Sequence, residues 1–249
     1  MTSSSSPDLY RLFHPQSVAV VGASTKRGAT WDSGNAYING CIRQSFRGRL
    51  YPVHPKAESI LGYQCYGSIL DIPESVDLAV ICIRASAAKQ AIEDCAQKGV
   101  SFVHMLTAGF GETGETSGTD EEEEIMVIAR KAGMRIVGPN CMGLYSPEGG
   151  LAWNGELPDR PGSVGLFSQS GQLANMVVRT SAQEGIYFSE VASFGNASDL
   201  QAHEFLDYLG EDSKTNVIAS YIEGLKDGRA FFEAAKKVTR KKPLVVWKG

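Results

Sequence analysis

The chain has 249 residues, of which 43% are hydrophobic, and it exceeds the length of a usual single domain. It is therefore expected to fold as two α/β domains with a sizeable core. The net charge is −4 and the Lys and Arg residues are scattered, which argues against a nucleic-acid partner. The five cysteines have no CxxC spacing, and no apolar run approaches a membrane span. These features favour a reduced, cytoplasmic protein without a membrane partner, and the polar residues 1–7 are expected to form a disordered tail.

The first half of the chain alternates short apolar runs with helical patterns, which predicts parallel strands joined by crossover helices. The expected strands are 17–22, 50–53, 76–83, 101–106 and 134–138. The helix before the last of them is expected to open with the acidic run 120–124 and to close with Arg130 and Lys131. These charges suit the two ends of a helix dipole.

The second half repeats this organisation after a Gly- and Pro-rich stretch, 146–162, which is expected to be a linker. The expected strands here are 163–168, 186–194, 216–222 and 243–247. The two halves begin with similar residues, SVAVVGAS at 17–24 and SVGLFSQS at 163–170. Each domain should therefore place a loop of small residues at the carboxyl end of its first strand, where open parallel sheets bind ligands.

The loop after the first strand is typical of backbone phosphate binding, because a glycine leads from the strand towards a helix. Gly22 and Gly28 do not form GxGxxG, and no acidic residue follows the second strand, so the NAD fingerprint is missing. Lys56 stands there instead. It could bind a ribose phosphate of NADP or coenzyme A, but taken alone it is read as an ordinary surface lysine.

Two further loops follow the fourth and fifth expected strands. In MLTAGFGETG, 105–114, the glycines would allow close approach to a ligand or would simply turn the chain. In GPNCMG, 138–143, Cys141 could be a nucleophile, but no histidine follows nearby to activate it. A structural thiol is therefore the preferred interpretation.

The turn Ser168–Gly171 lies where the first strand of the second domain passes into a helix. Its hydroxyls and free N–H groups would bind an anion, whereas the alternative is that Ser170 only caps the helix. The leading glycine of GxSxG is absent, which argues against a serine hydrolase.

Taken together and in order, nine segments resemble the NDP-forming acyl-CoA synthetases, relatives of the succinyl-CoA synthetase alpha subunit. They are LFHPQSVAVVGAS, GRLYPVHPK, ILGYQCYGSILDIPESVDLAVI, TAGFGE, RIVGPNCMG, FSQSGQL, SFGNASD, YIEGLKDGR and KKPLVVWKG. The resemblance implies a Rossmann-like CoA-binding domain, 8–145, and a flavodoxin-like ligase domain, 163–249, truncated at its C-terminal end. It implies the reaction of a small carboxylic acid with CoA and ATP, through an acyl phosphate and a phosphohistidine, to give acyl-CoA, ADP and phosphate.

The resemblance also implies roles for residues of the loops described above. Those at the CoA phosphates and nucleotide would be Gly22, Ala23, Ser24 and Lys56, and those along the pantetheine would be Thr107, Ala108 and Gly109. Those near the thiol and acyl group would be Asn140 and, as lining, Cys141; those receiving the phosphohistidine would be Ser168, Gln169, Ser170 and Gly171. Glu223 would orient that histidine, although without the resemblance it is read as a helix-start carboxylate. No metal site is expected in this chain.

The phosphorylated histidine of the family has no counterpart here. The four histidines, His14, His54, His104 and His203, lie outside any Ser-His-Thr-Gly-like segment, and no ATP-grasp pattern is present. The phosphohistidine, ATP and Mg²⁺ are therefore expected in a domain or beta subunit outside this chain, as parts of an oligomeric enzyme.

Two residues at the expected ligand entrance, Trp31 and Arg84, depart from the family and leave the acid unassigned. Arg84 could pair with a substrate carboxylate or a CoA phosphate, or it could be a rim residue in water. Two other functions remain open. One is a non-catalytic CoA sensor, such as the ligase-like half of a protein acetyltransferase. The other is an NADP-dependent reductase, suggested by Lys56 alone.

Overall fold

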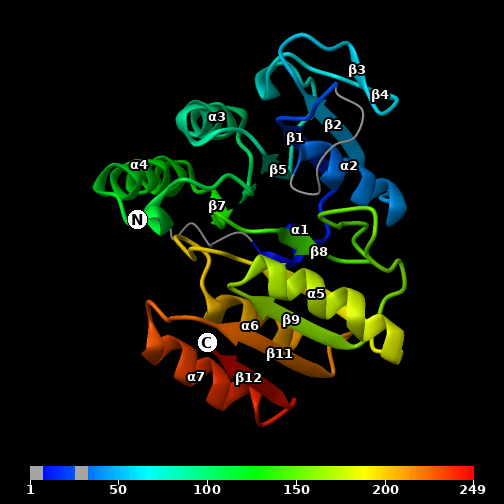
Figure 1. Cartoon of the computed structure of the whole chain (residues 1–249), viewed down its shortest axis with the longest axis vertical. Helices are drawn as coiled ribbons and strands as arrows, with labels where there is room; N and C mark the ends of the chain where they lie inside the picture. Colours follow the sequence, from blue (N-terminus) through cyan, green and yellow to red (C-terminus); the bar gives the residue numbers. More distant parts are fainter. Residues whose placement is uncertain (1–7, 26–32) are drawn as a thin grey trace.

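The computed structural model describes residues 8–25 and 33–249 and contains two five-stranded sheets (Figure 1). The first sheet is parallel throughout and has the order β2-β1-β5-β6-β7. Its strands are β1 (Ser17–Val21), β2 (Arg49–Val53), β5 (Leu78–Ile81), β6 (Phe102–Met105) and β7 (Arg135–Val137). Each of these strands lies within the apolar run that predicted it or overlaps that run closely. A hairpin of β3 (Ser59–Ile60) and β4 (Tyr63–Gln64) follows β2.

Helices cover both faces of the first sheet, which is why β5 and β6 are buried at every residue. Helix α2 (Gly34–Arg43) lies on one face, and α3 (Ala85–Lys98) and α4 (Thr116–Ala132) pack against each other on the other. Both α3 and α4 end at a glycine with left-handed backbone, Gly99 at φ 77° and Gly133 at φ 68°. Such a residue lets the chain leave the helix while the last carbonyls find partners.

The second sheet has the order β12-β11-β9-β10-β8. Its strands are β8 (Gly143–Tyr145), β9 (Val164–Ser168), β10 (Phe188–Ser193), β11 (Val217–Ile222) and β12 (Leu244–Lys248), and its helices are α5 (Gly171–Ser181), α6 (Ala202–Glu211) and α7 (Gly228–Val238). Strands β9 to β12 are parallel, and α6 packs against α7. With this strand order, the usual right-handed crossovers put α5 on the face opposite to α6 and α7. Among the described residues, no helix is both long and apolar enough to cross a bilayer.

Strand β8 differs from the expected division of the chain, which placed residues up to 145 in the first domain. It pairs antiparallel with β10 of the second sheet, Gly143 with Ser193 and Tyr145 with Val191. In Figure 1, β8 lies where the two sheets meet. A three-residue strand that pairs with a strand far along the chain leaves no local pattern, so the sequence did not reveal it.

The stretch 146–162, expected as a linker, is largely buried instead. Leu151 and Ala152 are completely buried and Trp153 is 2% exposed. The Trp153 indole donates a hydrogen bond of 3.0 Å to Asn175 Oδ1 on α5. These residues join the α2 face of the first sheet to the core of the second domain, so the segment is an integral part of the fold.

The acidic run 120–124 does not open its helix as expected, because α4 already begins at Thr116 and no acidic residue lies in its first turn. The basic end is confirmed, with Arg130 and Lys131 in the last turn. Of the acidic residues, Glu122 is half-buried and faces the second domain, where it accepts a hydrogen bond from the Ser198 hydroxyl.

Besides the buried segment 146–162, contacts of the loop after β10 and of the first helix hold the sheets together. The loop after β10 runs beside β7 and the residues that follow it: the N–H groups of 196, 198 and 200 donate to the carbonyls of 139, 138 and 136. Arg135 of β7 also bonds Asp199 at 3.0 Å and Glu204 at 2.8 Å. At the other edge, α1 (Leu9–Phe13) packs on α6, where the ring of Phe13 stacks on Tyr208.

Candidate functional site

The predicted site residues follow the carboxyl ends of strands in both sheets. In the first sheet, Gly22 follows β1, Thr107 follows β6 and Asn140 follows β7. In the second, Gln169 follows β9 and Glu223 follows β11. Open parallel sheets bind ligands at this edge.

Two contacts bring the strand ends of the two sheets together. A Cβ placed on Gly171, the first residue of α5, would lie 2.6 Å from Met142 Cγ. The amide of Asn140 donates to Asn196 Oδ1, on the loop after β10, at 3.4 Å. The loop expected near the CoA thiol therefore borders the loop expected to receive the phosphoryl group.

A cavity of about 210 Å³ opens at the carboxyl ends of β1 and β2, lined among others by Gly22, His54, Ser68 and Asp94. Gly22 has φ +100°, and a Cβ there would lie 2.3 Å from the carbonyl oxygen of Cys82. Only glycine fits this position, because both the backbone angle and the space exclude a side chain. The cavity occupies the place of a nucleotide site in an open α/β sheet.

Lys56 lies just beyond this cavity and is exposed. Its backbone N–H donates to His54 Nδ1 at 3.2 Å. Within residues 8–25 and 33–249, no carboxylate pairs with its ammonium group. The charge is therefore available to an anionic ligand.

The backbone of Ser24, which follows the buried Ala23, is held by a residue that the sequence analysis did not single out. Ala23 is 3% exposed. Asn35 of α2 accepts the Ser24 N–H at 2.8 Å and donates to the Ser24 carbonyl at 2.7 Å. The Ser24 N–H is thus already engaged, and the loop is shaped by Asn35. Trp31, which the sequence analysis noted as a departure from the family, lies outside the described residues.

The three residues expected along the pantetheine differ in access. Thr107 is 5% exposed and its hydroxyl donates to the Ile83 carbonyl at 2.9 Å, so it links the ends of β5 and β6. Ala108 and Gly109 are exposed. The Gly109 N–H already donates to Glu112 Oε1 at 2.5 Å. A ligand would therefore contact the exposed surface of Gly109 and not form a hydrogen bond to its N–H.

Cys141 is 5% exposed, and its Sγ lies 3.3 Å from the Met105 carbonyl. Burial raises the pKa of this thiol well above its usual value, which keeps it protonated and unreactive. The structural interpretation of Cys141 therefore agrees with its surroundings. Its neighbour Asn140 is exposed and adopts a left-handed backbone at φ 56°.

The side chains of the turn after β9 shape the turn itself. Ser170 caps α5 by accepting the Leu173 N–H at 3.3 Å, and the buried Ser168 hydroxyl donates to the Ser170 carbonyl at 2.8 Å. In the described part of the chain, the N–H groups of Gly171 and Gln172 have no acceptor. These two donors, at the positive end of α5, are free for an anion.

Glu223 is exposed and does not start a helix. Asp227 caps α7 instead, accepting the Ala230 N–H at 2.8 Å. The Glu223 N–H donates to Gln169 Oε1 at 2.6 Å, so the turn after β9 holds the Glu223 loop. The Glu223 carboxylate has no cationic partner in 8–25 and 33–249.

The four histidines all lie in the described part of the chain, and none hydrogen-bonds to the loops of Gln169 or Glu223. His54 lines the cavity above, and His14 bonds Glu190 at 2.8 Å. His104 is fully buried in β6, and His203 is half-buried on α6. The described residues also contain no group of three or more His, Cys, Asp or Glu that could hold a metal ion.

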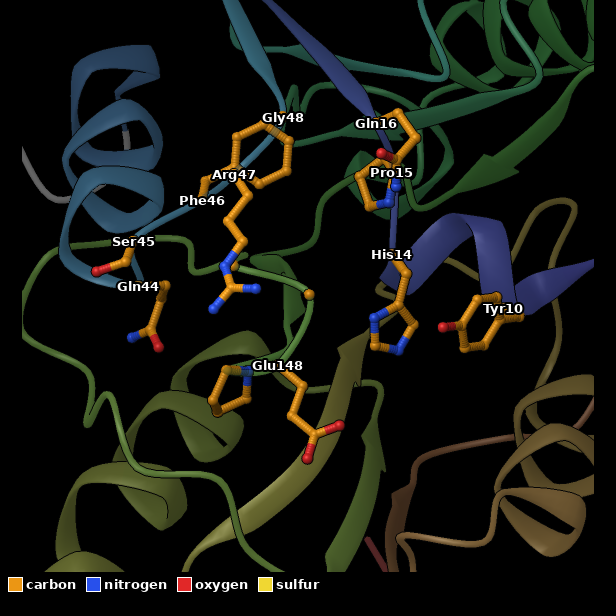
Figure 2. Close-up of a pocket in the computed structure, with 13 residues that line it drawn as sticks. Tyr10, His14, Pro15, Gln16, Gln44, Ser45, Phe46, Arg47, Gly48 and Glu148 are labelled. Atoms are coloured by element: carbon orange, nitrogen blue, oxygen red, sulfur yellow. The ribbon is translucent and has the colours of Figure 1, made fainter.

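A larger cavity of about 550 Å³ lies at the opposite edge of the first sheet, beside the amino ends of β1 and β2 (Figure 2). Its walls include Tyr10, His14, Gln44, Arg47 and Glu148, and none of the predicted site residues. Since parallel sheets bind ligands at their carboxyl edge, we place the functional site at the smaller cavity.

Comparisons with known proteins identify the domains that the two halves of the chain resemble. Residues 16–147 match the model of a CoA binding domain, and residues 161–249 match a succinyl-CoA ligase like flavodoxin domain. The chain is 41% identical over 242 residues to acetate–CoA ligase [ADP-forming] I of Archaeoglobus fulgidus, covering 96% of this chain and 34% of that protein. It is also 41% identical over 240 residues to the alpha subunit of acetate–CoA ligase [ADP-forming] II of Pyrococcus furiosus, covering 95% of this chain and 51% of that subunit.

A solved structure shows the same architecture. The dinucleotide-forming acetyl-coenzyme A synthetase 1 of Ca. Korarchaeum cryptofilum, in complex with phosphate and ADP, superposes with a TM-score of 0.90 at 36% identity, over 97% of this chain and 51% of that one. The chain spans about a third to a half of the length of the relatives that it matches. It belongs to the NDP-forming acyl-CoA synthetase family and carries the CoA-binding and flavodoxin-like domains of that family.

Proposed function

We propose that the chain is the CoA-binding and ligase-core portion of an enzyme that joins a small carboxylic acid to CoA, with ATP converted to ADP and phosphate. The observation that carries this proposal is the contact of Gly171 with Met142, since it brings the strand ends of both sheets together. The phosphohistidine, ATP and Mg²⁺ would be supplied by an ATP-grasp domain or beta subunit outside these 249 residues. We assign residues 8–142 to the CoA-binding domain and residues from 143 onwards to the ligase domain, because β8 pairs with β10.

CoA would enter at the cavity beside Gly22 and His54. The unpaired ammonium group of Lys56 would bind a CoA phosphate as a point charge. From there the pantetheine would pass the exposed Ala108 and Gly109 and bring the thiol to Asn140. The thiol sulfur would attack the acyl carbon of the acyl phosphate, and the bond from that carbon to the phosphate oxygen would break. Inorganic phosphate would leave and take up the proton that the thiol loses.

The turn after β9 would receive the phosphoryl group. The free N–H groups of Gly171 and Gln172 at the start of α5 suit a negatively charged phosphoryl group in transit. The Glu223 carboxylate, held in place by Gln169, would accept the N–H of the incoming imidazole. That bond fixes the tautomer whose other nitrogen carries the phosphoryl group.

Arg84 would extend the positive rim of the site. It precedes α3, is exposed, and forms no ion pair within the described ranges. A substrate carboxylate or a CoA phosphate would be its partner. All five cysteines are free, which supports a location in the reducing cytoplasm.

The proposal is tested by calorimetric titration of the 249-residue chain with CoA, 3′-dephospho-CoA and NADPH. We expect CoA to bind about tenfold more tightly than 3′-dephospho-CoA, because a factor of this size corresponds to one charge-assisted contact with the 3′-phosphate. Lys56→Ala should remove that difference, whereas Lys131→Ala, at the far end of α4, should leave it unchanged. Binding of NADPH with no binding of CoA would overturn the proposal in favour of a reductase.

A further inference from the structure

Asn196 occupies a position between three loops at the junction of the sheets. It lies on the loop after β10, and its backbone N–H donates to the Pro139 carbonyl at 3.1 Å. Its side-chain oxygen faces the Asn140 amide at 3.4 Å. Its side-chain nitrogen donates to two carboxylates of the first domain, Glu112 at 2.6 Å and Glu122 at 3.0 Å.

Those two carboxylates in turn hold the backbone of the glycine-rich loop. Glu112 Oε1 accepts the N–H groups of Gly109 at 2.5 Å and Phe110 at 3.2 Å. Glu122 Oε2 accepts the Gly111 N–H at 3.1 Å. Three consecutive amides of the loop are therefore bound by carboxylates that meet at a single amide nitrogen.

The arrangement needs a donor at position 196. Two carboxylates that approach one point repel each other unless a hydrogen-bond donor lies between them. Burial alone would raise the pKa of Glu112. The hydrogen bonds from Asn196 and from the amides of Gly109 and Phe110 lower this pKa by more than burial raises it, so the net result is a pKa below the usual value. The Asn196 amide thus stabilises Glu112 as an anion in the place where the loop needs it.

We infer that Asn196 is a positioning residue, which couples the glycine-rich loop 107–113 of the CoA-binding domain to the loop after β10 of the ligase domain. The inference rests on the proposed function, in which CoA binds beside Gly109. Its consequence is that the second domain, through Asn196, shapes the loop that CoA contacts. Neither Asn196 nor the two carboxylates need touch the ligand.

The decisive variant is Asn196→Asp, because it keeps the shape of the side chain and replaces the donor by a third carboxylate. We expect the 249-residue chain with this change to bind CoA about tenfold more weakly, the size of a lost hydrogen bond to a charged group. We also expect hydrogen exchange of the amides of Gly109, Phe110 and Gly111 to become about tenfold faster, because their acceptors are displaced.

A reciprocal change separates positioning from general damage. Combining Asn196→Asp with Glu112→Gln places a donor at 112 opposite an acceptor at 196, while Oε1 at 112 can still accept the loop amides. The double variant should therefore recover part of the CoA affinity and part of the slow exchange. Ser198→Ala is the matched control: it removes a hydroxyl bonded to Glu122 but leaves the bond of Asn196 to Glu112, and it should bind CoA like the unmodified chain.

The possible outcomes are distinct. Unchanged exchange of the three amides in Asn196→Asp would overturn the inference, and so would a loss of affinity that the double variant does not reduce. If the unmodified chain binds no CoA, the proposed function fails. The exchange rates of the loop amides still decide whether Asn196 positions the loop.

Discussion

The side-chain oxygen of Gln169 accepts the backbone N–H of Glu223 at 2.6 Å and that of Gly224 at 3.0 Å, and it thereby joins the loops after β9 and β11. We predict that Gln169→Ala lowers the free energy of unfolding by about 1 kcal/mol. Hydrogen exchange at the amides of Glu223 and Gly224 should become faster, as both lose their acceptor. Gln169→Glu keeps an oxygen at this place and should retain slow exchange; equal exchange in both variants would contradict this role.

Arg135 is the main ionic link between the sheets. Its side chain is only 18% exposed and pairs with Asp199 and Glu204, which are 20% and 25% exposed. Removing one partner of a poorly solvated ion pair leaves the others uncompensated. We therefore predict that Arg135→Ala lowers the free energy of unfolding by about 3 kcal/mol, measured by urea denaturation.

The control for this prediction is Arg229→Ala on α7. Arg229 also forms an ion pair, with Glu233, but its side chain is 81% exposed. Exposed pairs contribute little, so the loss should stay below about 0.5 kcal/mol. Similar losses in the two arginine variants would show that solvent screens the interface pair as well.

Alanine substitutions at Gly22 and Gly62 distinguish the energetic cost of backbone strain from that of steric overlap. Both have positive φ, +100° and +84°, but a Cβ on Gly62 meets no atom of the described residues within 4 Å. Gly62→Ala should therefore cost only about 1 kcal/mol of unfolding free energy, the backbone contribution. Gly22→Ala should cost about 3 kcal/mol or more, since its Cβ would also overlap the Cys82 carbonyl. Thermal and urea unfolding measure both values, and equal costs would mean that the β1 loop moves freely aside.

The regular parts of the fold were predictable because their signals are local. The runs at 76–83 and 101–106 predicted strands, and β5 and β6 are buried at every residue as two-sided strands should be. Ser170 at the start of α5 was also readable as a cap. Nine motifs in register identified the family. The roles assigned to individual site residues remain predictions.

The features that the sequence did not reveal depend on contacts between distant segments. Strand β8 is defined only by its pairing with β10. The stretch 146–162 has the composition of a linker, but its Leu151 and Trp153 are buried between the domains. Asn35 and Asn196 carry ordinary amide side chains, and their importance follows from their partners, the backbone of Ser24 for Asn35 and the Glu112 carboxylate for Asn196. Neither periodicity nor spacing in the sequence predicts contacts between such distant residues.

His104 provides a test of stability against pH. Its ring is fully buried in β6, and within residues 8–25 and 33–249 neither ring nitrogen has a hydrogen-bond partner. Burial lowers its pKa from 6.5 to about 4, because the charged imidazolium is poorly solvated there. Above about pH 6.5 the ring is neutral in both the folded and the unfolded chain, so it contributes no pH dependence.

Below about pH 6.5 the unfolded chain binds a proton that the folded chain excludes until about pH 4, so the free energy of unfolding falls through this window as the pH is lowered. The total loss from this one group is about 3 kcal/mol. His104→Leu should remove that part of the acid dependence in urea unfolding at about pH 7 and about pH 4.5. His203→Gln, which changes a half-buried histidine on α6, should keep it. If the leucine variant loses stability with acid as steeply as the unmodified chain does, the His104 ring already takes up its proton in the folded protein, and the acid sensitivity arises at the carboxylates.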